Sequence, residues 1–164
     1  MSSSTPEVLA AAILTVSDSS ARGERTDLSG PAVAEILKQR NFAVVATEIV
    51  ADDQAAIQQT IIRLARQARL VVTAGGTGIA ERDVTPEATR AICDRLLEGV
   101  AERMRFEGSK KTPLAALSRG ICGVRGRVLI LNLPGSPRGA SESLEAVIDL
   151  LPHALALLSG DTQH

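Results

Sequence analysis

The stretch that decides the fold runs from Val72 to Thr89 and reads VTAGGTGIAERDVTPEAT. An apolar run ends at Gly75, Gly76 and Gly78, and a helical pattern begins again behind a proline. This is the order of a strand, a glycine loop, a charged turn and a helix. Glycines let the backbone approach a ligand and take positive φ, and amides at a helix start favour an anion such as phosphate. The glycines alone leave open an ordinary strand-to-helix turn.

Asp83 adds a negative charge beside this loop. A carboxylate there would repel a phosphate unless a divalent cation lay between them, so Asp83 indicates a magnesium nucleotide.

Outside this stretch, strand patterns alternate with helix patterns. Val8–Val16 is apolar almost throughout and predicts a central parallel strand buried on both faces. Further strands are predicted at 42–50 and 70–73, and at 121–124 and 127–133, which are joined by a hairpin turn at 125–126. Helices are predicted behind an N-cap at Ser29, behind Asp52 or Asp53, and at 86–97, 100–106, 112–119 and 139–158, the last bent or divided at Pro152.

This order specifies an α/β three-layer sandwich with a mostly parallel sheet and an antiparallel edge pair. Ligands of such sheets bind beyond the carboxyl ends of the strands. The segments that follow strands should therefore meet at one edge: Ser17, Asp52, Gly75–Gly78 and Pro134–Gly135.

Composition limits the classes of function. The chain has 164 residues, and we expect one domain over 8–164 behind a disordered segment 1–7. Its only aromatic residues are Phe42 and Phe106, which argues against a stacking platform for single-stranded nucleic acid. A net charge of -1 provides no global field for nucleic acid or an anionic membrane.

Cysteine and histidine usage gives no metal site. Cys93 and Cys122 are expected to be buried and reduced, and His153 and His164 lack a second ligand at a suitable spacing. The N-terminus lacks the charged and apolar regions of a secretory signal, and no apolar run reaches the ~18 residues of a membrane span. We therefore expect a cytoplasmic protein.

Four blocks of the chain resemble the molybdenum cofactor biosynthesis proteins of the Mog and MoaB type. They are TVSDSSARGERTDLSGP at 15–31, VADDQ at 50–54, GGTGIAERDVTPEAT at 75–89 and LILNLPGSP at 129–137. The resemblance extends from about residue 11 to residue 158. It implies that the terminal phosphate of a dithiolene pterin, molybdopterin, is coupled to AMP from ATP with release of pyrophosphate. It also implies a homotrimer, and a downstream molybdenum-inserting protein is a candidate partner.

The resemblance assigns roles to individual residues. Asp52 and Asp83 match the catalytic acids that hold or orient Mg²⁺, although Asp52 can also be read as a helix N-cap. Ser118 and Arg119 match a block that contacts the pterin phosphate, the alternative being a surface helix end. The remaining matches are the glycine loop for nucleotide phosphates or ribose (Gly75, Gly76, Thr77, Gly78), the pterin or nucleotide site (Ser17, Asp27) and the adenosine side or an ordinary turn (Asn132, Pro134, Gly135).

Between residues 103 and 111 the chain carries four basic side chains that we expect to be solvated: Arg103, Arg105, Lys110 and Lys111. The two lysines could also add to the field that attracts phosphate. Two other functions compete with adenylyl transfer. One is a nucleotide pyrophosphatase, because a competence-damage protein family shares this fold, but the block from Arg82 to Pro86 favours the adenylyltransferase. The other is a binding or scaffold module, against which Asp52 and Asp83 argue.

Overall fold

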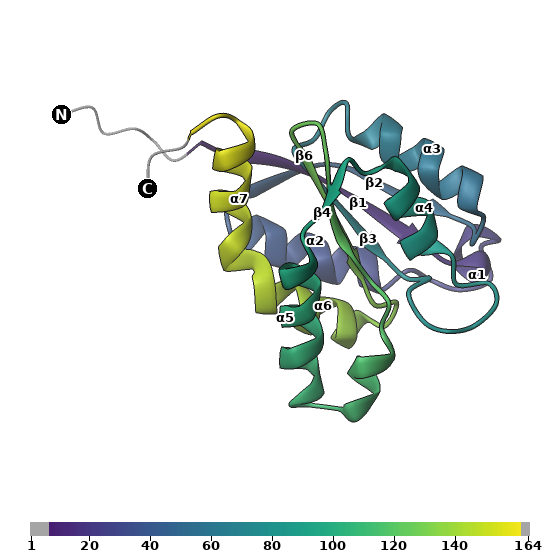
Figure 1. Ribbon diagram of the computed structural model, residues 1–164. Helices are drawn as coiled ribbons and strands as arrows, with labels where there is room; N and C mark the ends of the chain where they lie inside the picture. Colours follow the sequence, from purple (N-terminus) through teal and green to yellow (C-terminus); the bar gives the residue numbers. More distant parts are fainter. Residues whose placement is uncertain (1–6, 162–164) are drawn as a thin grey trace.

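The computed structural model describes residues 7–161, which form a six-stranded sheet between two layers of helices (Figure 1). The strand order is β2-β1-β3-β6-β5-β4. The first four strands in this order run parallel, β5 runs antiparallel to β6, and β4 runs antiparallel to β5. The predicted fold class is confirmed. The strands are β1 (Leu9–Val16), β2 (Phe42–Val50), β3 (Leu70–Ala74), β4 (Arg95–Leu96), β5 (Cys122–Arg125) and β6 (Val128–Leu133).

The helices cover the sheet on both faces. Helices α3 and α4 lie on one face, and α2, α5, α6 and α7 belong to the other, where α5 and the short turn after it project beyond the sheet (Figure 1). Their bounds are α1 (Asp18–Ala21), α2 (Ser29–Gln39), α3 (Gln54–Leu64), α4 (Thr85–Ile92), α5 (Glu98–Ser109), α6 (Pro137–Val147) and α7 (Leu151–Leu158), with 3-10 turns η1 (Pro113–Leu117) and η2 (Ile148–Leu150).

Strand β1 shows why the sequence selects this architecture. Ala11 and Ile13 lie in the core beneath α2 and α6, whereas Ala12 and Leu14 lie in the core beneath α3. All four are fully buried. Because successive side chains of a strand point to opposite faces, a strand covered on both sides reads as an unbroken apolar run.

The helix predicted for 86–97 is too long. Helix α4 ends at Ile92, and Arg95–Leu96 is the short edge strand β4. The backbone N–H of Asp94 donates to Val124 O at 2.7 Å, and that of Leu97 donates to Cys122 O at 2.8 Å. Pairing with β5 therefore replaces the end of the predicted helix.

Two other boundaries also differ from prediction. A one-turn helix, α1, lies between β1 and α2, where the sequence predicted no element, and the last predicted helix begins at Pro137 and divides at η2. Pro152 lies in the first turn of α7, where a missing N–H has no cost, so the predicted division at this proline is confirmed.

Cys122 is buried and Cys93 is half-buried, and both are free thiols. Burial raises the pKa of Cys122 to about 12 and that of Cys93 to about 11. Within residues 7–161, no helix has the length and apolar character needed to cross a membrane. Apart from Glu7, the predicted disordered segment lies outside the described residues, as does His164.

Candidate functional site

A cleft of about 380 Å³ lies at the carboxyl ends of β1, β3 and β6. We call residues 17–29 the serine loop and residues 75–84 the glycine loop; both line it, as does the segment between β6 and α6. The convergence expected from topology is therefore observed. Of the predicted site residues, the lining contains Ser17, Asp27, Asp52, Gly75, Gly76, Asp83 and Gly135.

Asp27 organises the serine loop. Its Oδ1 accepts hydrogen bonds from the backbone N–H groups of Ser29 and Gly30, both at 3.1 Å, and its Oδ2 accepts the hydroxyl of Thr15 at 2.8 Å. The carboxylate thus satisfies free amides at the start of α2, so the predicted N-cap at Ser29 is wrong. Ser29 is instead the first residue of the helix, and its hydroxyl donates to Gly135 O at 2.6 Å.

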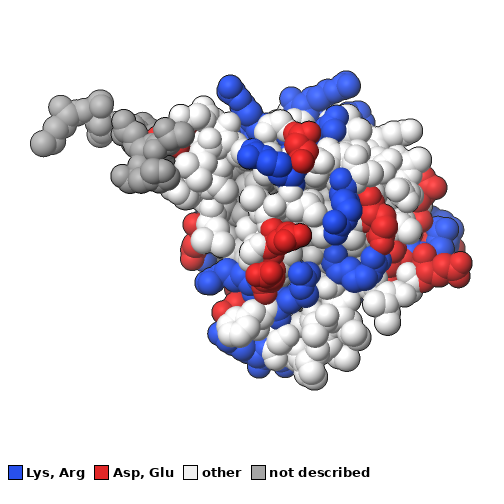
Figure 2. Space-filling model, in the orientation of Figure 1, with Lys and Arg blue, Asp and Glu red and all other residues white. Residues whose placement is uncertain are grey.

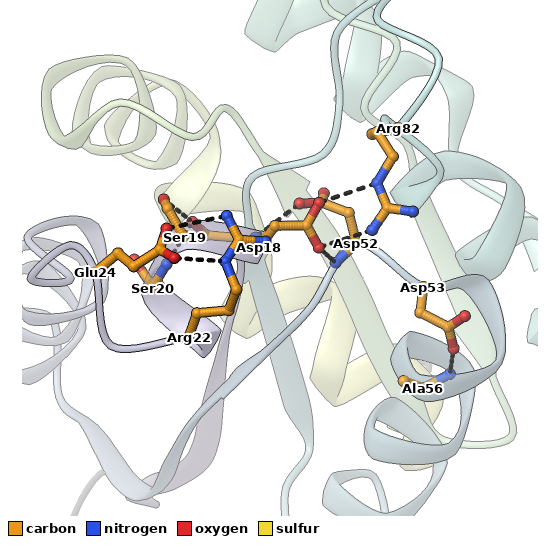
Figure 3. Close-up of polar contacts among 10 residues, drawn as sticks. Asp18, Ser19, Ser20, Arg22, Glu24, Asp52, Asp53, Ala56 and Arg82 are labelled. Atoms are coloured by element: carbon orange, nitrogen blue, oxygen red, sulfur yellow. Dashed lines mark hydrogen bonds and ion pairs between the residues drawn. The ribbon is translucent and has the colours of Figure 1, made fainter.

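Asp52 is held by a reciprocal pair of contacts with Asp18 (Figure 3). The N–H of Asp18 donates to Asp52 Oδ2, and the N–H of Asp52 donates to Asp18 Oδ1, both at 2.9 Å. The neighbouring Asp53 caps α3 through the N–H of Ala56 at 2.8 Å. Asp52 is therefore not the helix cap, and its carboxylate lines the cleft.

The two carboxylates of this pair have opposite electrostatic surroundings. Burial raises the pKa of Asp52; the hydrogen bond from Asp18 opposes this effect, and the charges of Asp18 and Asp83 add to it. Arg82 donates to both carboxylate oxygens of Asp18, at 3.0 and 2.8 Å (Figure 3), and lowers the pKa of Asp18. Asp18 is thus paired directly with Arg82, whereas the charge of Arg82 affects the pKa of Asp52 less than burial and the neighbouring carboxylates do.

Two glycines let the glycine loop approach its neighbours. Gly75 and Gly76 have φ values of 110° and 67°. A Cβ on Gly75 would collide with Val16 O, and one on Gly76 would lie 3.1 Å from Asp52 Oδ1. The backbone therefore passes close to the carboxylate of Asp52. The N–H of Gly75 already donates to Leu133 O at 3.0 Å, so this amide is committed to the fold.

Other predicted residues lie outside the cleft lining. Thr77 is buried and Gly78 follows it, while Ser118 and Pro134 line a smaller hollow beside α5. Arg119 directs its guanidinium toward backbone carbonyls of the glycine loop. Of these residues, Arg119 contacts the glycine loop from outside the lining.

Asn132 was predicted on the adenosine side, but it is 1% exposed and its side chain is fully engaged. Its Oδ1 accepts the N–H of Ile121 at 3.2 Å, and its Nδ2 donates to the hydroxyls of Thr73 and Thr89, both at 3.0 Å. These bonds join β3, β6, α4 and the segment before β5. The structure gives Asn132 a structural role beneath the glycine loop.

Sequence reasoning missed several cleft residues: Thr15, Ser20, Arg25, Thr26 and Ser136. Ser20 and Ser136 come shortly after the strands β1 and β6, and this position is the signal that could have found them. Thr15 lies near the end of β1, and Arg25 and Thr26 belong to the loop between α1 and α2. Among residues 7–161, Arg25 is the one basic residue in the lining, which also carries the carboxylates of Asp27, Asp52 and Asp83.

Arg105, predicted to be solvated, is half-buried and donates to Gly120 O at 3.0 Å.

On the face shown in Figure 2, basic and acidic side chains are interspersed. Any attraction for phosphate on this face must therefore be local.

A family model described as "Probable molybdopterin binding domain" matches residues 12–153, and the chain belongs to this family. A Helicobacter pylori (strain J99) protein named molybdopterin adenylyltransferase is 42% identical over 153 residues, which cover 91% of this chain and 87% of that protein. The protein of the same name from Escherichia coli K12 is 37% identical over 164 residues, covering 90% and 84%.

A solved structure extends the similarity to three dimensions. The crystal structure of MoaB from Thermus thermophilus, described as a molybdopterin biosynthesis enzyme, superposes with a TM-score of 0.88 at 54% identity. The match covers 93% of this chain and 97% of that one.

Proposed function

We propose that this chain is a molybdopterin adenylyltransferase, a nucleotidyltransferase of molybdenum cofactor biosynthesis. It transfers AMP from ATP to the terminal phosphate of molybdopterin and releases pyrophosphate. The relatives named for this activity support the proposal along most of their length. The structural observation that carries it is the meeting of Asp52 and Asp83 with Gly75 and Gly76 in one cleft.

The composition of the cleft suits this reaction. An oxygen of the pterin phosphate forms a bond to the α-phosphorus of ATP, and the bond from that phosphorus to the bridging oxygen of pyrophosphate breaks. Such a transfer depends on alignment and charge neutralisation rather than on a protein nucleophile. Consistent with this, the lining contributed by the described residues holds carboxylates, hydroxyls and glycine backbone, and neither cysteine nor histidine.

Asp52 and Asp83 are proposed to hold Mg²⁺ together with the phosphates. The charge of Asp83 contributes to the raised pKa of Asp52, so the two carboxylates repel each other, and a cation would relieve that repulsion. Mg²⁺ prefers oxygen ligands and is often held by one or two carboxylates plus substrate phosphates. When bound, it would neutralise charge on the phosphate oxygens. A Cβ on Gly76 would collide with Thr85 Oγ1 and lie 3.1 Å from Asp52 Oδ1, so the glycine lets the backbone come this close to the carboxylate.

The basic residue of the lining, Arg25, is proposed to bind a substrate phosphate. A guanidinium is well suited to phosphate oxygens. Ser17 and Ser29 lie on the same loop, and Ser29 already donates its hydroxyl to Gly135 O, so it shapes this wall of the cleft.

A homotrimer is also proposed. Large apolar side chains are exposed where α5 and η1 project from the sheet: Phe106 is 66% exposed, Leu114 70% and Leu117 52%. Large exposed apolar side chains gathered in one region mark contact sites between proteins when they form a continuous patch. Static light scattering should give a trimer mass; a monomer mass across micromolar concentrations would reject the trimer.

The function is tested by mixing the protein, MgATP and molybdopterin and detecting adenylylated pterin by mass spectrometry. Pterin-dependent release of pyrophosphate, abolished by EDTA, is the expected result. Equal hydrolysis of ATP without pterin would identify a pyrophosphatase instead. Tight pterin binding without any adenylylated product would identify a binding module.

A further inference from the structure

Arg119 connects the segment before β5 to both ends of one stretch of the glycine loop. Its backbone N–H donates to Thr77 O at 2.8 Å. Its side chain donates from Nε to Gly78 O at 2.7 Å and from Nη2 to Asp83 O at 2.8 Å. Nη1 forms an ion pair with the carboxylate of Glu87 on α4. One residue thus holds the carbonyls on either side of residues 79–82.

The stretch between those carbonyls is also tied to the serine loop, by the exposed ion pair of Arg82 with Asp18. Residues 79–82 are exposed, and Ile79 is 72% exposed, so no buried side chain anchors them. Within the stretch, Asp83 N–H donates to Ala80 O at 2.9 Å, and Ala80 N–H donates to Asp83 Oδ2 at 3.1 Å. These bonds close the turn but do not fix it against the sheet. Ordering such a turn costs conformational entropy, which contacts from outside must offset.

The charge of Arg119 is already matched within the chain. Burial acts to raise the pKa of Glu87, but the hydrogen bond and charge of Arg119 hold that pKa below its ordinary value. Arg119 is also absent from the lining of the cleft. A guanidinium that bonds two carbonyls and a carboxylate has few donors left for a substrate.

We infer that Arg119 is a positioning residue for Asp83: it clamps the carbonyls of Gly78 and Asp83 and so fixes the Asp83 carboxylate over the cleft. The part of this inference that concerns turnover rests on the proposed function. It replaces the expectation, drawn from the resemblance, that Arg119 binds the pterin phosphate. The planar fork of arginine is essential to the clamp, since a lysine ammonium cannot span the same acceptors.

The test compares Arg119→Ala and Arg119→Lys with Arg125→Ala. Arg125 donates to Ile92 O at 2.8 Å, so its loss removes a similar arginine-to-carbonyl bond away from the cleft. Amide hydrogen exchange of residues 78–83 is measured without ligands, and kcat and the KM values for pterin and MgATP are measured with them. Melting temperature monitors folding.

A clamp predicts that both Arg119 variants exchange the amides of residues 78–83 at least about 10-fold faster than the wild type. It also predicts a fall in kcat of at least about 10-fold, with the pterin KM changed less than about 2-fold. Arg125→Ala should leave both properties unchanged.

Two results would overturn the inference. One is a raised pterin KM in Arg119→Ala that lysine restores, with unchanged exchange, because this is the signature of a phosphate ligand. The other is wild-type exchange and kcat in Arg119→Lys, which decides the matter even if the alanine variant does not fold. If the wild type makes no adenylylated pterin, the proposed function fails, but hydrogen exchange still tests the clamp.

Discussion

The serine loop and the glycine loop follow neighbouring parallel strands, β1 and β3, and both line the cleft, but different parts of the chain hold them. Asp27 fixes the serine loop through Thr15, Ser29 and Gly30, all close to it in sequence. The glycine loop is held by Arg119, which lies far along the chain. The part of the serine loop around Asp27 is therefore shaped locally, while its beginning is tied to Asp52 through Asp18. The stretch from Gly78 to Asp83 depends on a residue far along the chain.

Of all the substitutions in the two loops, we expect the largest effect on adenylyl transfer at Asp83, through which the glycine loop supplies a carboxylate to the cleft. Asp83→Asn keeps the size and an oxygen acceptor for the Ala80 N–H but loses the charge. We expect adenylyl transfer to fall at least about 100-fold, a barrier increase of about 2.7 kcal/mol, with pterin binding retained. Single-turnover rates check this.

Asp53→Asn is the matched control, because asparagine also caps helices well and Asp53 lies outside the cleft lining. Wild-type turnover of Asp83→Asn at saturating MgATP and pterin would show that the catalytic centre is misplaced.

Asp52→Asn should lower turnover by about 10-fold or more, because it removes the second carboxylate of the cleft. The same substitution should raise the free energy of unfolding at neutral pH. A raised pKa means that the folded state binds the proton more tightly than the unfolded state, so the free energy of unfolding falls as pH rises through the window above the ordinary value.

In EDTA at neutral pH, Asp52→Asn should therefore melt above the wild type, and the difference should vanish when the pH is below the unfolded pKa. Thermal melts across this pH range check the sign. A variant that is less stable at neutral pH would show that the ionised carboxylate stabilises the fold.

Asp27→Ala tests local control of the serine loop. The substitution leaves the amides of Ser29 and Gly30 and the hydroxyl of Thr15 without their acceptor. We expect a loss of about 1–2 kcal/mol in the free energy of unfolding. Asp27→Asn retains an acceptor and a good cap, so denaturant melts should show a smaller loss. Accelerated hydrogen exchange should be confined to the serine loop and the start of α2; equal acceleration in the glycine loop would contradict independent support.

The smallest effect is expected at Arg82, which joins the two loops through an exposed ion pair with Asp18. Exposed ion pairs contribute little to stability, so the melting temperature of Arg82→Ala should be close to that of the wild type. The pKa of Asp18 should rise, because its main stabilising partner is lost. An NMR titration of the carboxylates measures this rise, and Arg22→Ala, which leaves the Arg82 pair intact, is the control. An unchanged pKa would show that the pair does not persist in solution.

Much of the fold was predictable because its signals are local. The apolar run through Ala11 and Leu14 predicted the central strand, and the glycine loop was recognised from its order of residues. The edge strand at Arg95–Leu96 was missed because only its pairing with β5 distinguishes it from the end of a helix.

The residues of the candidate site also fall into those that local sequence signals predict and those that only the folded chain reveals. Asp52 and Gly75 follow strands, so topology placed them at the cleft, and Asp83 was singled out by its charge beside the glycine loop. The resemblance linked Arg119 and Asn132 to substrates, with a surface helix end and an ordinary turn as the alternatives, but a matching residue does not reveal where its side chain points. Their acceptors and donors come from segments that only the folded chain brings together.

The buried cluster of Asn132, Thr73 and Thr89 has an evolutionary consequence. Asn132 donates to both threonine hydroxyls and accepts the backbone N–H of Ile121, so changing Asn132 alone strands polar groups in the core. Exchanging all three side chains for apolar ones spares the two hydroxyls but still leaves the Ile121 N–H without its acceptor. A lineage that changes these positions one at a time must pass through less stable intermediates. We therefore expect the three positions to be inherited as a unit and, where they differ among homologues, to differ together.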